Sequence, residues 1–495
     1  MKQIAKYFSA RNLLLAGIIL YAVLKIQLLL LHHDIRWDEA VYLTMGKYLL
    51  SAGEIGFWES LRPPLWPALL AVYQAIGDPV LLGEITNAIL GALGATLLYL
   101  TLKKHINAYL ATAAALLLLF SNIWFWHSSQ LLTGVASATL IIASFYAYSK
   151  QRPLLAGVLA AAAFLTRFPA GMGFAALLVA ECIHAWPNKK EYFTQKKLPT
   201  NATKLVLGFA APVLAWMTIN SFVYSDFGVQ APIQPLLTGS GNVFFMNVWL
   251  HETSLLFYFT HLLWWLPVTA LAVFGITKSL KNPALTAYAV LAALSLGFFT
   301  ILPNNQWRFA LLILPGVLVL TALGAQKLSE KNQKLQQFIT LAIIINLGAL
   351  VIHDINLLND RGPQPSAIEE DYYRFLENHP VNGTIYVSDP VVAWYAPNKA
   401  TPIYYEQLKD VEELMQEEAA AVFFIPRSTP CAPSQTSCQE NVEAFTENLI
   451  EEYALVHNTT LHGYHYFVFS NQIALPAQDP QQVREAITYV QENPE

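Results

Sequence analysis

Residues 34–78 read DIRWDEAVYLTMGKYLLSAGEIGFWESLRPPLWPALLAVYQAIGD, and they form the longest polar connection in the apolar N-terminal part of the chain. Apolar residues recur at helical spacing between Glu39 and Leu50, which predicts a short helix lying along a membrane surface. The RPPLWP turn that follows is predicted to end one such helix and to begin another, because proline suits the start of a helix. This pattern indicates an external loop of a membrane protein.

The composition of the rest of the chain supports this interpretation. The chain has 495 residues, of which 55% are hydrophobic and 13% charged, and its mean hydropathy is +0.39. Ordinary soluble domains contain about 25% charged residues, so most of this chain avoids water. Residues 360–495 differ, because they contain many Asp and Glu among alternating apolar residues. We therefore predict a transmembrane domain over 1–355 and a soluble domain over 360–495.

Apolar segments of spanning length recur along the first domain. The segment nearest the N-terminus is about 20 residues long, which fits a spanning helix better than a cleaved signal peptide. The predicted spans, about eleven by the length rule, cover 12–32, 80–101, 108–126, 129–148, 153–167, 170–186, 204–224, 255–277, 283–301, 307–325 and 336–353. The sequence thus predicts a mainly α, polytopic helical bundle.

Basic residues are concentrated in every second predicted connection. The groups are Lys2, Lys6 and Arg11; Lys103 and Lys104; Lys150 and Arg152; Lys189, Lys190, Lys196 and Lys197; Lys278 and Lys281; and Lys327, Lys331 and Lys334. Because lysine and arginine concentrate in cytoplasmic loops, the N-terminus is predicted to be cytoplasmic. An odd number of crossings then places the C-terminal domain outside. We predict a multi-pass integral plasma membrane protein in contact with membrane lipids; the net charge of −5 gives no reason to expect nucleic acid.

The opposite side contains few basic residues, namely Arg36, Lys47, Arg62, Arg167 and Arg308. The four arginines stand beside an aromatic residue or a proline, in IRWDEA, LRPPLW, TRFPAG and QWRFAL. An arginine at this level can extend to lipid headgroups or can bind a phosphate through its bidentate fork. The scarcity of other basic residues on this side argues against all four arginines being only lipid anchors.

Two carboxylates, Asp38 and Glu39, lie at the start of the predicted surface helix beside Trp37 and Tyr42. Such a carboxylate could deprotonate an acceptor hydroxyl or amine, or it could bind a metal ion. It could also be a solvated acid at a helix start, where the helix dipole favours negative charge. Composition alone leaves these alternatives open.

The chain resembles a known family in several places. WDEAVYLTMGKYLLSAG followed by RPPLWPALLA is similar to the first outer loop of the lipid-carrier glycosyltransferases of the GT-C fold, in particular the superfamily of protein O-mannosyltransferases and lipid A aminoarabinose transferases. AAAFLTRFPAG resembles the helix–Arg–Pro segment of that family, and NNQWRFALLILPGVLVL resembles its late Arg-aromatic-apolar-Pro segment. These similar segments are distributed over most of residues 1–325.

The resemblance implies an enzyme that transfers a sugar from a polyprenyl or dolichyl phosphate to an acceptor outside the membrane, in one inverting displacement. By position, Asp38 matches the catalytic aspartate of the family, and Glu39 is the adjacent acid that orients the acceptor or the base. Arg62, Arg167 and Arg308, with Arg36 as a further candidate, would then form a cationic pocket for the departing phosphate.

Trp37 and Tyr42, beside the two carboxylates, are candidates for substrate binding. Two other polar residues are further candidates. His127, in NIWFWHSSQ, could hydrogen-bond the donor sugar or be an interfacial histidine in an aromatic belt. Lys25 lies inside the first apolar run, where an ionisable residue is a functional candidate, although it is close enough to the outer end to snorkel.

The sequence predicts chemistry without a metal or another cofactor. No acid occurs between Asn122 and Ser137, where many members of the resembled family have one. The first outer loop also lacks a DxD motif, since Asp34 and Asp38 are four positions apart.

The C-terminal region alternates strand-like runs such as GTIYVSD and AAVFFIP with helical ones, which predicts a small α/β domain. We expect it to cap the catalytic face or to bind the acceptor, whose identity the sequence does not reveal. Cys431 and Cys438 could form a disulfide in an oxidising compartment or remain free thiols.

Two other functional classes agree less well with the sequence. A lipid or solute transporter would show broken helices at corresponding positions of two halves, and the sequence shows no convincing internal repeat. A non-catalytic sensor or assembly protein would leave the RPP segment and the outer arginines unexplained.

Overall fold

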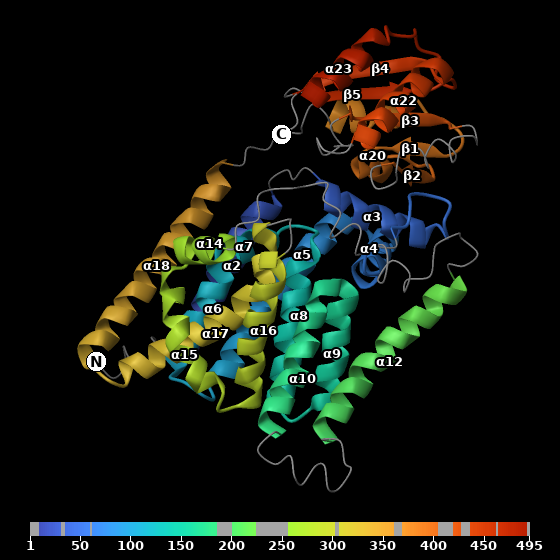
Figure 1. Ribbon diagram of the computed structural model, residues 1–495. Helices are drawn as coiled ribbons and strands as arrows, with labels where there is room; N and C mark the ends of the chain where they lie inside the picture. The colour runs from blue at the N-terminus through green and yellow to red at the C-terminus, as the bar shows by residue number, and fades with distance from the viewer. Residues whose placement is uncertain are drawn as a thin grey trace.

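The computed structural model describes residues 9–30, 35–59, 62–185, 200–223, 256–301, 306–360, 369–403, 419–426, 436–461 and 464–492. A bundle of long helices carries a small α/β unit at one end (Figure 1). This confirms the predicted fold class of a mainly α membrane bundle with a C-terminal α/β part. Whether Cys431 and Cys438 form a disulfide is not tested, because Cys431 lies outside the described residues.

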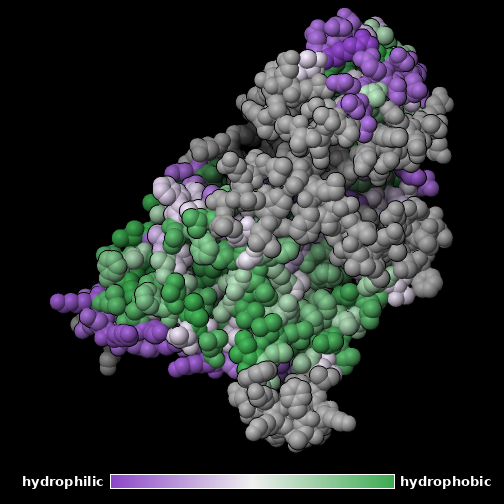
Figure 2. Space-filling model, viewed as in Figure 1, coloured by the Kyte–Doolittle hydropathy of each residue, from purple (hydrophilic) through white to green (hydrophobic). Residues whose placement is uncertain are grey.

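Seven helices of the described chain are long and apolar enough to cross a membrane. They are α2 (Ala10–Leu29), α5 (Pro79–Leu102), η1 (Phe168–Ala170) with α10 (Gly171–Ala185), α12 (Thr200–Val223), α16 (Pro283–Ile301), η5 (Trp307–Phe309) with α17 (Ala310–Ser329), and α18 (Gln333–Asp360). Most of α17 is buried among the other helices. Apolar side chains cover the visible outer face of the bundle (Figure 2), as expected for helices that face lipid.

Three predicted spans coincide with shorter helices. These are α6 (Ala108–Phe120), α8 (Thr133–Ser149) and α9 (Pro153–Thr166), of 13, 17 and 14 residues. The predicted span 108–126 is wrong at its end, because Ser121 is extended, with φ −62° and ψ 131°, and separates α6 from the short helix α7 (Asn122–His127).

The predicted span 255–277 is bent. It consists of α14 (Phe257–Trp265), η4 (Pro267–Leu271) and α15 (Ala272–Ser279), with a bend of 114°. The bend follows from Pro267, because proline disfavours helical geometry in the residue before it, and Leu266 has φ −133° and ψ 64°. The described helices therefore give seven spans, or eight if the bent pair is one span, and the count of about eleven stays a prediction.

Glycines allow α9 and α12 to pack backbone against backbone. A Cβ atom at Gly157 would lie 2.3 Å from the carbonyl oxygen of Leu205, and one at Gly208 would lie 2.2 Å from that of Leu154. Small residues at such crossings are typical of membrane helices. The contact fixes α9, which carries Arg167 directly after its last residue.

The basic helix ends gather at the end of the bundle opposite the α/β unit. Lys278 forms an ion pair with Glu330 at 2.9 Å, and Lys327 donates a hydrogen bond to Thr277 at 2.8 Å. The amide of Asn107 donates to Gln326 at 3.1 Å, which brings the connection after α5 to the same end. Figure 2 shows polar residues along this rim. The orientation of the rim toward the cytoplasm stays a prediction.

Two short helices lie at the other end of the bundle. These are α3 (Trp37–Leu50) and α4 (Leu65–Ile76), which flank the RPP turn as predicted. Gln74 of α4 donates to the carbonyl of Leu43 at 2.8 Å and ties the two helices together. Most of α3 is buried, because the α/β unit covers it (Figure 1).

The α/β unit is built on a five-stranded sheet with strand order β2-β1-β3-β5-β4. Its strands are β1 (Ile385–Val387), β2 (Ala400–Pro402), β3 (Ala421–Phe424), β4 (Leu455–Leu461) and β5 (Tyr464–Phe469), and its helices are η6 (Glu369–Tyr373), α19 (Phe375–Asn378), α20 (Pro390–Tyr395), α22 (Thr436–Glu452) and α23 (Gln481–Glu492). Strand β1 pairs in parallel with β2 and β3, whereas β5 pairs antiparallel with β3 and β4. The sheet is therefore mixed.

The unit is bound to the membrane bundle through α3 and the loop that follows it. Gly56 donates to the carbonyl of Asn398 and accepts from the amide of Ala400, both at 2.9 Å. Lys47 of α3 donates to the carbonyl of Ala396 at 3.3 Å. Apolar residues of α3, such as Val41, share a core with the sheet. The helix that begins at Trp37 is thus held from both sides.

Candidate active site

Asp38 lies in the first turn of α3 and is the centre of a charged cluster. Its Oδ1 lies 2.7 Å from Nη2 of Arg62, and its Oδ2 accepts a hydrogen bond from Nη1 of Arg308. Arg62 precedes α4, and Arg308 lies in η5, so three distant segments meet at one carboxylate. Burial alone would raise the pKa of Asp38, but Arg62 and Arg308 outweigh it and hold that pKa well below its ordinary value.

A second acid, Glu59, joins the cluster and was not predicted from the sequence. Its Oε1 lies 3.0 Å from Nε of Arg62, and only 7% of its side chain is exposed. Burial raises the pKa of Glu59, and the charge of Arg62 opposes that effect. The only sequence signal was its position three residues before Arg62. Arg62 is therefore shared between two carboxylates.

Glu39 is buried and faces backbone amides. Its Oε2 accepts from the amide of Arg36, and its Oε1 accepts from the amide of Leu131, both at 2.9 Å. The first bond caps α3, and the second ties α3 to the connection between α7 and α8. These bonds fix the position of the helix turn that carries Asp38.

Arg167 stands beside Arg308. The two guanidinium carbons lie 5.4 and 5.8 Å from the centroid of the Phe309 ring. Arg167 forms no ion pair with a carboxylate among the residues that the structure describes. A Cβ atom at Gly134, in the first turn of α8, would lie 3.6 Å from its Nη1, so the N-terminal end of that helix is close to Arg167.

The remaining predicted residues surround this cluster. The guanidinium carbon of Arg62 lies 5.5 Å from the centroid of the Tyr42 ring. The hydroxyl of Tyr42 lies 3.4 Å from Oγ1 of Thr133 at the start of α8. Arg36 is exposed and lies 5.6 Å above the ring of Trp126. Trp37 packs, partly buried, against the core of the α/β unit.

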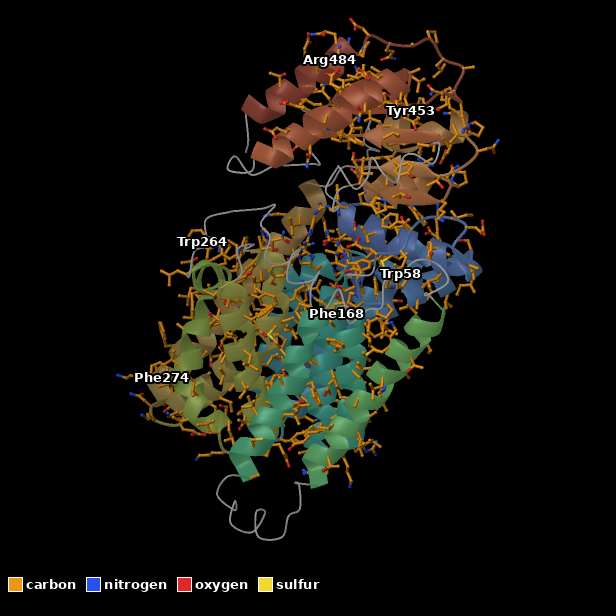
Figure 3. All side chains as sticks on the ribbon, turned by 45° about the vertical axis from the view of Figure 1, so that its right-hand side comes forward. Trp58, Phe168, Trp264, Phe274, Tyr453 and Arg484 are labelled. Atoms are coloured by element: carbon orange, nitrogen blue, oxygen red, sulfur yellow. The ribbon has the colours of Figure 1, made fainter. Side chains whose placement is uncertain are left out.

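His127 is held neutral near the arginines. Burial, together with the charge of Arg308, lowers the pKa of His127 to about 3, although a contact with Gln130 opposes this. A neutral imidazole can both donate and accept a hydrogen bond. In Figure 3, Trp58 and Phe168, the sequence neighbours of Glu59 and Arg167, are labelled at this end of the bundle.

Lys25 belongs to a second polar cluster. Its Nζ lies 2.5 Å from Oγ of Ser129, and it also donates to the carbonyl of Phe125. It interacts electrostatically with Asp354 of α18, whose side chain is fully buried. Neither carboxylate oxygen of Asp354 has a hydrogen-bond partner within the described part of the chain. The structure thus places Lys25 against the segment that carries His127.

This cluster gives a prediction about stability. Lys25→Met is expected to lower the free energy of unfolding by about 1–3 kcal/mol, because it leaves the buried Phe125 carbonyl and Ser129 hydroxyl without their donor and removes a positive charge near the buried Asp354. Unfolding of the purified protein in detergent by SDS titration measures the change. The double variant Lys25→Met/Asp354→Leu should recover part of the loss. A double variant less stable than Lys25→Met would contradict an electrostatic coupling between the two residues.

Among the described residues, no group of three or more His, Cys, Asp and Glu side chains could hold a metal ion. The prediction of a metal-independent reaction stays a prediction.

Comparisons with known proteins identify the family of this chain. A sequence profile of the Alg9-like mannosyltransferase family matches residues 54–391, which is more than half of the chain. The chain belongs to the Alg9-like mannosyltransferase family. No curated protein matches it. The family region begins before Glu59 and includes Arg62, Arg167 and Arg308, whereas Asp38 precedes it.

Solved structures show the same fold. ArnT from Cupriavidus metallidurans bound to undecaprenyl phosphate superposes with a TM-score of 0.63 at 10% identity, over 94% of this chain and 98% of that chain. The same protein in its apo state superposes with a TM-score of 0.62 at 11% identity, over 95% of this chain and 100% of that chain. The Archaeoglobus fulgidus oligosaccharyltransferase, tethered with an acceptor peptide, superposes with a TM-score of 0.53 at 13% identity. The superposition covers 95% of this chain and 75% of that chain.

These findings confirm the predicted GT-C fold and the prediction of a glycosyltransferase. The sequence resemblance pointed to the O-mannosyltransferase and aminoarabinose transferase superfamily; the family profile that matches is the Alg9-like one, and ArnT appears as a structural neighbour. The protein is an integral membrane enzyme, as predicted. The transporter and sensor alternatives are set aside.

Proposed function

We propose that this enzyme transfers mannose, or a closely related sugar, from a polyprenyl or dolichyl phosphate to a hydroxyl or amine of an extracytoplasmic acceptor. The observation that carries the proposal is the meeting of Asp38 with Arg62 and Arg308, with Arg167 beside them. The lipid-phosphate donor is supported by the family and by ArnT, whose structure contains undecaprenyl phosphate.

The arginines are suited to the phosphate of the donor. Guanidinium groups bind phosphate oxygens through two parallel hydrogen bonds, and these bonds strengthen as negative charge develops on the leaving group. Arg167 has no carboxylate partner among the described side chains and lies near the N-terminal end of α8, whose dipole also favours an anion. We therefore assign the donor phosphate to the space between Arg167 and Arg308, with Arg62 and Arg36 at its edge.

Asp38 is the proposed general base. In the displacement, the acceptor O–H or N–H gives its proton to a carboxylate oxygen of Asp38, and the acceptor atom attacks the anomeric carbon. The bond from that carbon to the phosphate oxygen breaks, and the lipid phosphate leaves with the electron pair. Attack opposite to the leaving group inverts the anomeric configuration.

The low pKa of Asp38 makes the isolated carboxylate poorly suited to this role. A carboxylate held by two guanidinium groups is a weak base. The donor phosphate competes for the same guanidinium groups, however, and its arrival weakens their bonds to Asp38. The pKa of Asp38 then rises, so the carboxylate becomes a stronger base once the donor is bound.

The orientation of the site follows from the charge pattern. The basic rim lies at the end of the bundle opposite Asp38, and basic residues favour the cytoplasmic side. We therefore propose that the N-terminus is cytoplasmic, and that Asp38 and the α/β unit are extracytoplasmic.

A transfer assay tests the proposal. The purified full-length protein is reconstituted in liposomes with radiolabelled polyprenyl-phosphate mannose and hydroxyl-bearing acceptors. We expect labelled product together with free polyprenyl phosphate in equal amounts, and the same yield after treatment with EDTA. Movement of intact donor across the bilayer without transfer would contradict the proposal, and loss of transfer in EDTA with recovery in Mn²⁺ would contradict its metal-independent form.

A further inference from the structure

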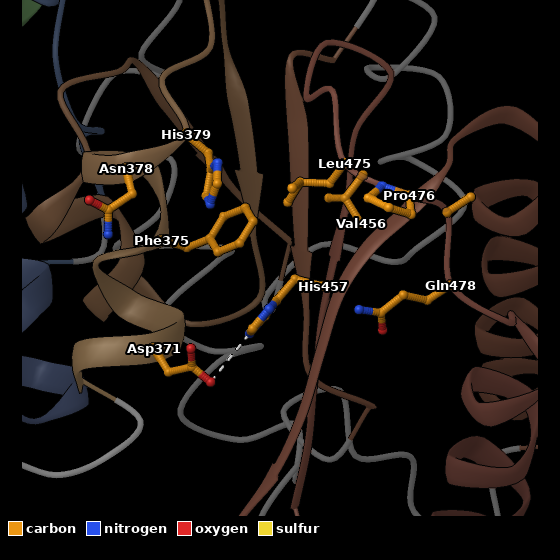
Figure 4. Close-up of a pocket in the computed structure, with 10 residues that line it drawn as sticks. Asp371, Phe375, Asn378, His379, Val456, His457, Leu475, Pro476 and Gln478 are labelled. Atoms are coloured by element: carbon orange, nitrogen blue, oxygen red, sulfur yellow. Dashed lines mark ion pairs between the residues drawn. The ribbon is translucent and has the colours of Figure 1, made fainter.

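The α/β unit contains a cavity that the proposed active site does not use. The cavity has a volume of about 420 Å³ and lies among η6, α19, β4 and the segment after β5 (Figure 4). Ligand pockets for small molecules usually measure about 300–1,000 Å³. All of its lining residues belong to the C-terminal part of the chain.

Aromatic rings form one wall of the cavity. The ring of Phe375 lies between two imidazoles, with centroid distances of 4.6 Å to His379 and 4.9 Å to His457 (Figure 4). All three rings line the cavity, and Phe375 is the most deeply buried of them. Val456, Leu475 and Pro476 add apolar surface.

The polar groups of the lining are mostly neutral. Nε2 of His457 is buried and has no hydrogen-bond partner among the described residues; the Asp371 carboxylate lies 3.6 Å away, too far for a hydrogen bond. Burial lowers the pKa of His457, with Asp371 opposing, so this ring is neutral near pH 7. Asn378 and Gln478 contribute carboxamides, and Gln478 extends toward His457 in Figure 4.

The chemistry of these lining residues indicates which class of ligand fits the cavity. The lining contains one carboxylate and no lysine or arginine, so a phosphate or another anion would be repelled rather than bound. The carboxamides and the neutral imidazole of His457 both donate and accept hydrogen bonds, which matches hydroxyl groups, since each hydroxyl does the same. The apolar wall suits the C–H face of a ring.

We propose that this cavity binds a neutral sugar unit, and that this sugar is part of the acceptor. The second half of this inference rests on the proposed function. Phe375 and Val456 belong to the same apolar core as Val41 and Met45 of α3, the helix that begins beside Asp38. An acceptor glycan held here would thus be anchored to the element that carries the proposed base.

Direct binding tests the cavity without catalysis. The full-length protein is purified in a detergent without a sugar headgroup and titrated calorimetrically with di- to tetrasaccharides ending in mannose, glucose or galactose. We expect saturable binding of at least one of them. The double variant Asn378→Ala/Gln478→Ala should weaken it about tenfold or more, because each lost hydrogen bond contributes about 1 kcal/mol. Both side chains are exposed, and an unchanged unfolding temperature verifies the fold.

Two control variants separate the outcomes. Gln481→Ala removes an exposed carboxamide from α23, outside the cavity, and should leave binding unchanged. Asp38→Asn should also bind the saccharide normally. No binding by any saccharide, or equal binding by the double variant, overturns the cavity site. Binding that is lost in Asp38→Asn instead would place the saccharide at the active site.

The transfer assay tests the link to the acceptor. With the tightest-binding saccharide as acceptor, the double variant should raise the acceptor KM about tenfold, whereas kcat and the donor KM stay unchanged. An unchanged acceptor KM overturns the assignment to the acceptor, even if the cavity binds sugar. If the wild type transfers nothing, the proposed function fails, and the calorimetric result for the cavity still stands.

Discussion

Asp38→Asn is expected to lower kcat for sugar transfer by about 10²–10⁴-fold, the usual contribution of a general base. The amide cannot accept the proton of the acceptor. It also no longer competes with phosphate for Arg62 and Arg308, which now bridge to Asp38. The donor KM should therefore stay constant or fall. Initial rates at varied concentrations of polyprenyl-phosphate mannose measure both quantities.

The control for this variant is Asp78→Asn. Asp78 caps α5 by accepting from the amide of Val80 at 2.8 Å, and asparagine is an equally good cap. Both changes remove one carboxylate, but only Asp38 touches the arginines. A rate of transfer equal to that of the wild type would remove Asp38 from the mechanism. A loss confined to the donor KM would make Asp38 a binding residue instead.

Much of this site could be predicted from the sequence because the topology of a membrane protein is readable. Asp38, Arg167 and Arg308 each stand at the end of an apolar segment, and alternation of the spans places those ends on one side. Polar side chains on one side of a bundle can meet only in the thin layer where the helices end. The meeting of Asp38 with Arg308, far apart along the chain, follows from that restriction.

The parts that could not be predicted depend on packing. Glu59 lies in a polar loop, and the sequence of that loop does not indicate whether the Glu59 side chain is solvated or buried against Arg62. Glu39 was predicted beside Asp38, but adjacent residues of a helix point in different directions, and its oxygens instead meet the amides of Arg36 and Leu131. Asp354 lies near Lys25 only because α18 packs against α2.

The bend at Pro267 shows the limit of the length rule. A hydropathy window registers an apolar composition but not the direction of the chain, so α14 and α15 gave the same signal as one straight span. The proline was visible in the sequence, and proline is tolerated in other membrane helices, such as α17, which contains Pro315. The backbone of Leu266 is not helical, so the chain bends before Pro267, whereas α17 continues through Pro315.

Arg167→Met is expected to lower kcat/KM for the donor by about 10²–10³-fold, the usual effect of removing one group that stabilises a developing charge. Arg167 is chosen because its guanidinium forms no ion pair with a carboxylate among the described residues, so it can bind a phosphate without first losing another partner. Arg167→Lys should restore part of the activity, since lysine retains the charge but not the bidentate geometry.

Inhibition by free polyprenyl phosphate separates binding from chemistry. This product carries the phosphate without the sugar, so its inhibition constant should rise in Arg167→Met together with the loss of kcat/KM. Arg152→Met is the matched control, because Arg152 and Arg167 flank the two ends of the same helix, α9. Only Arg167 lies at the end near Asp38, and the charge at the other end should not affect the donor. An unchanged affinity for polyprenyl phosphate in Arg167→Met would mean that the phosphate binds elsewhere, and the assignment of the outer arginines to the donor would fail with it.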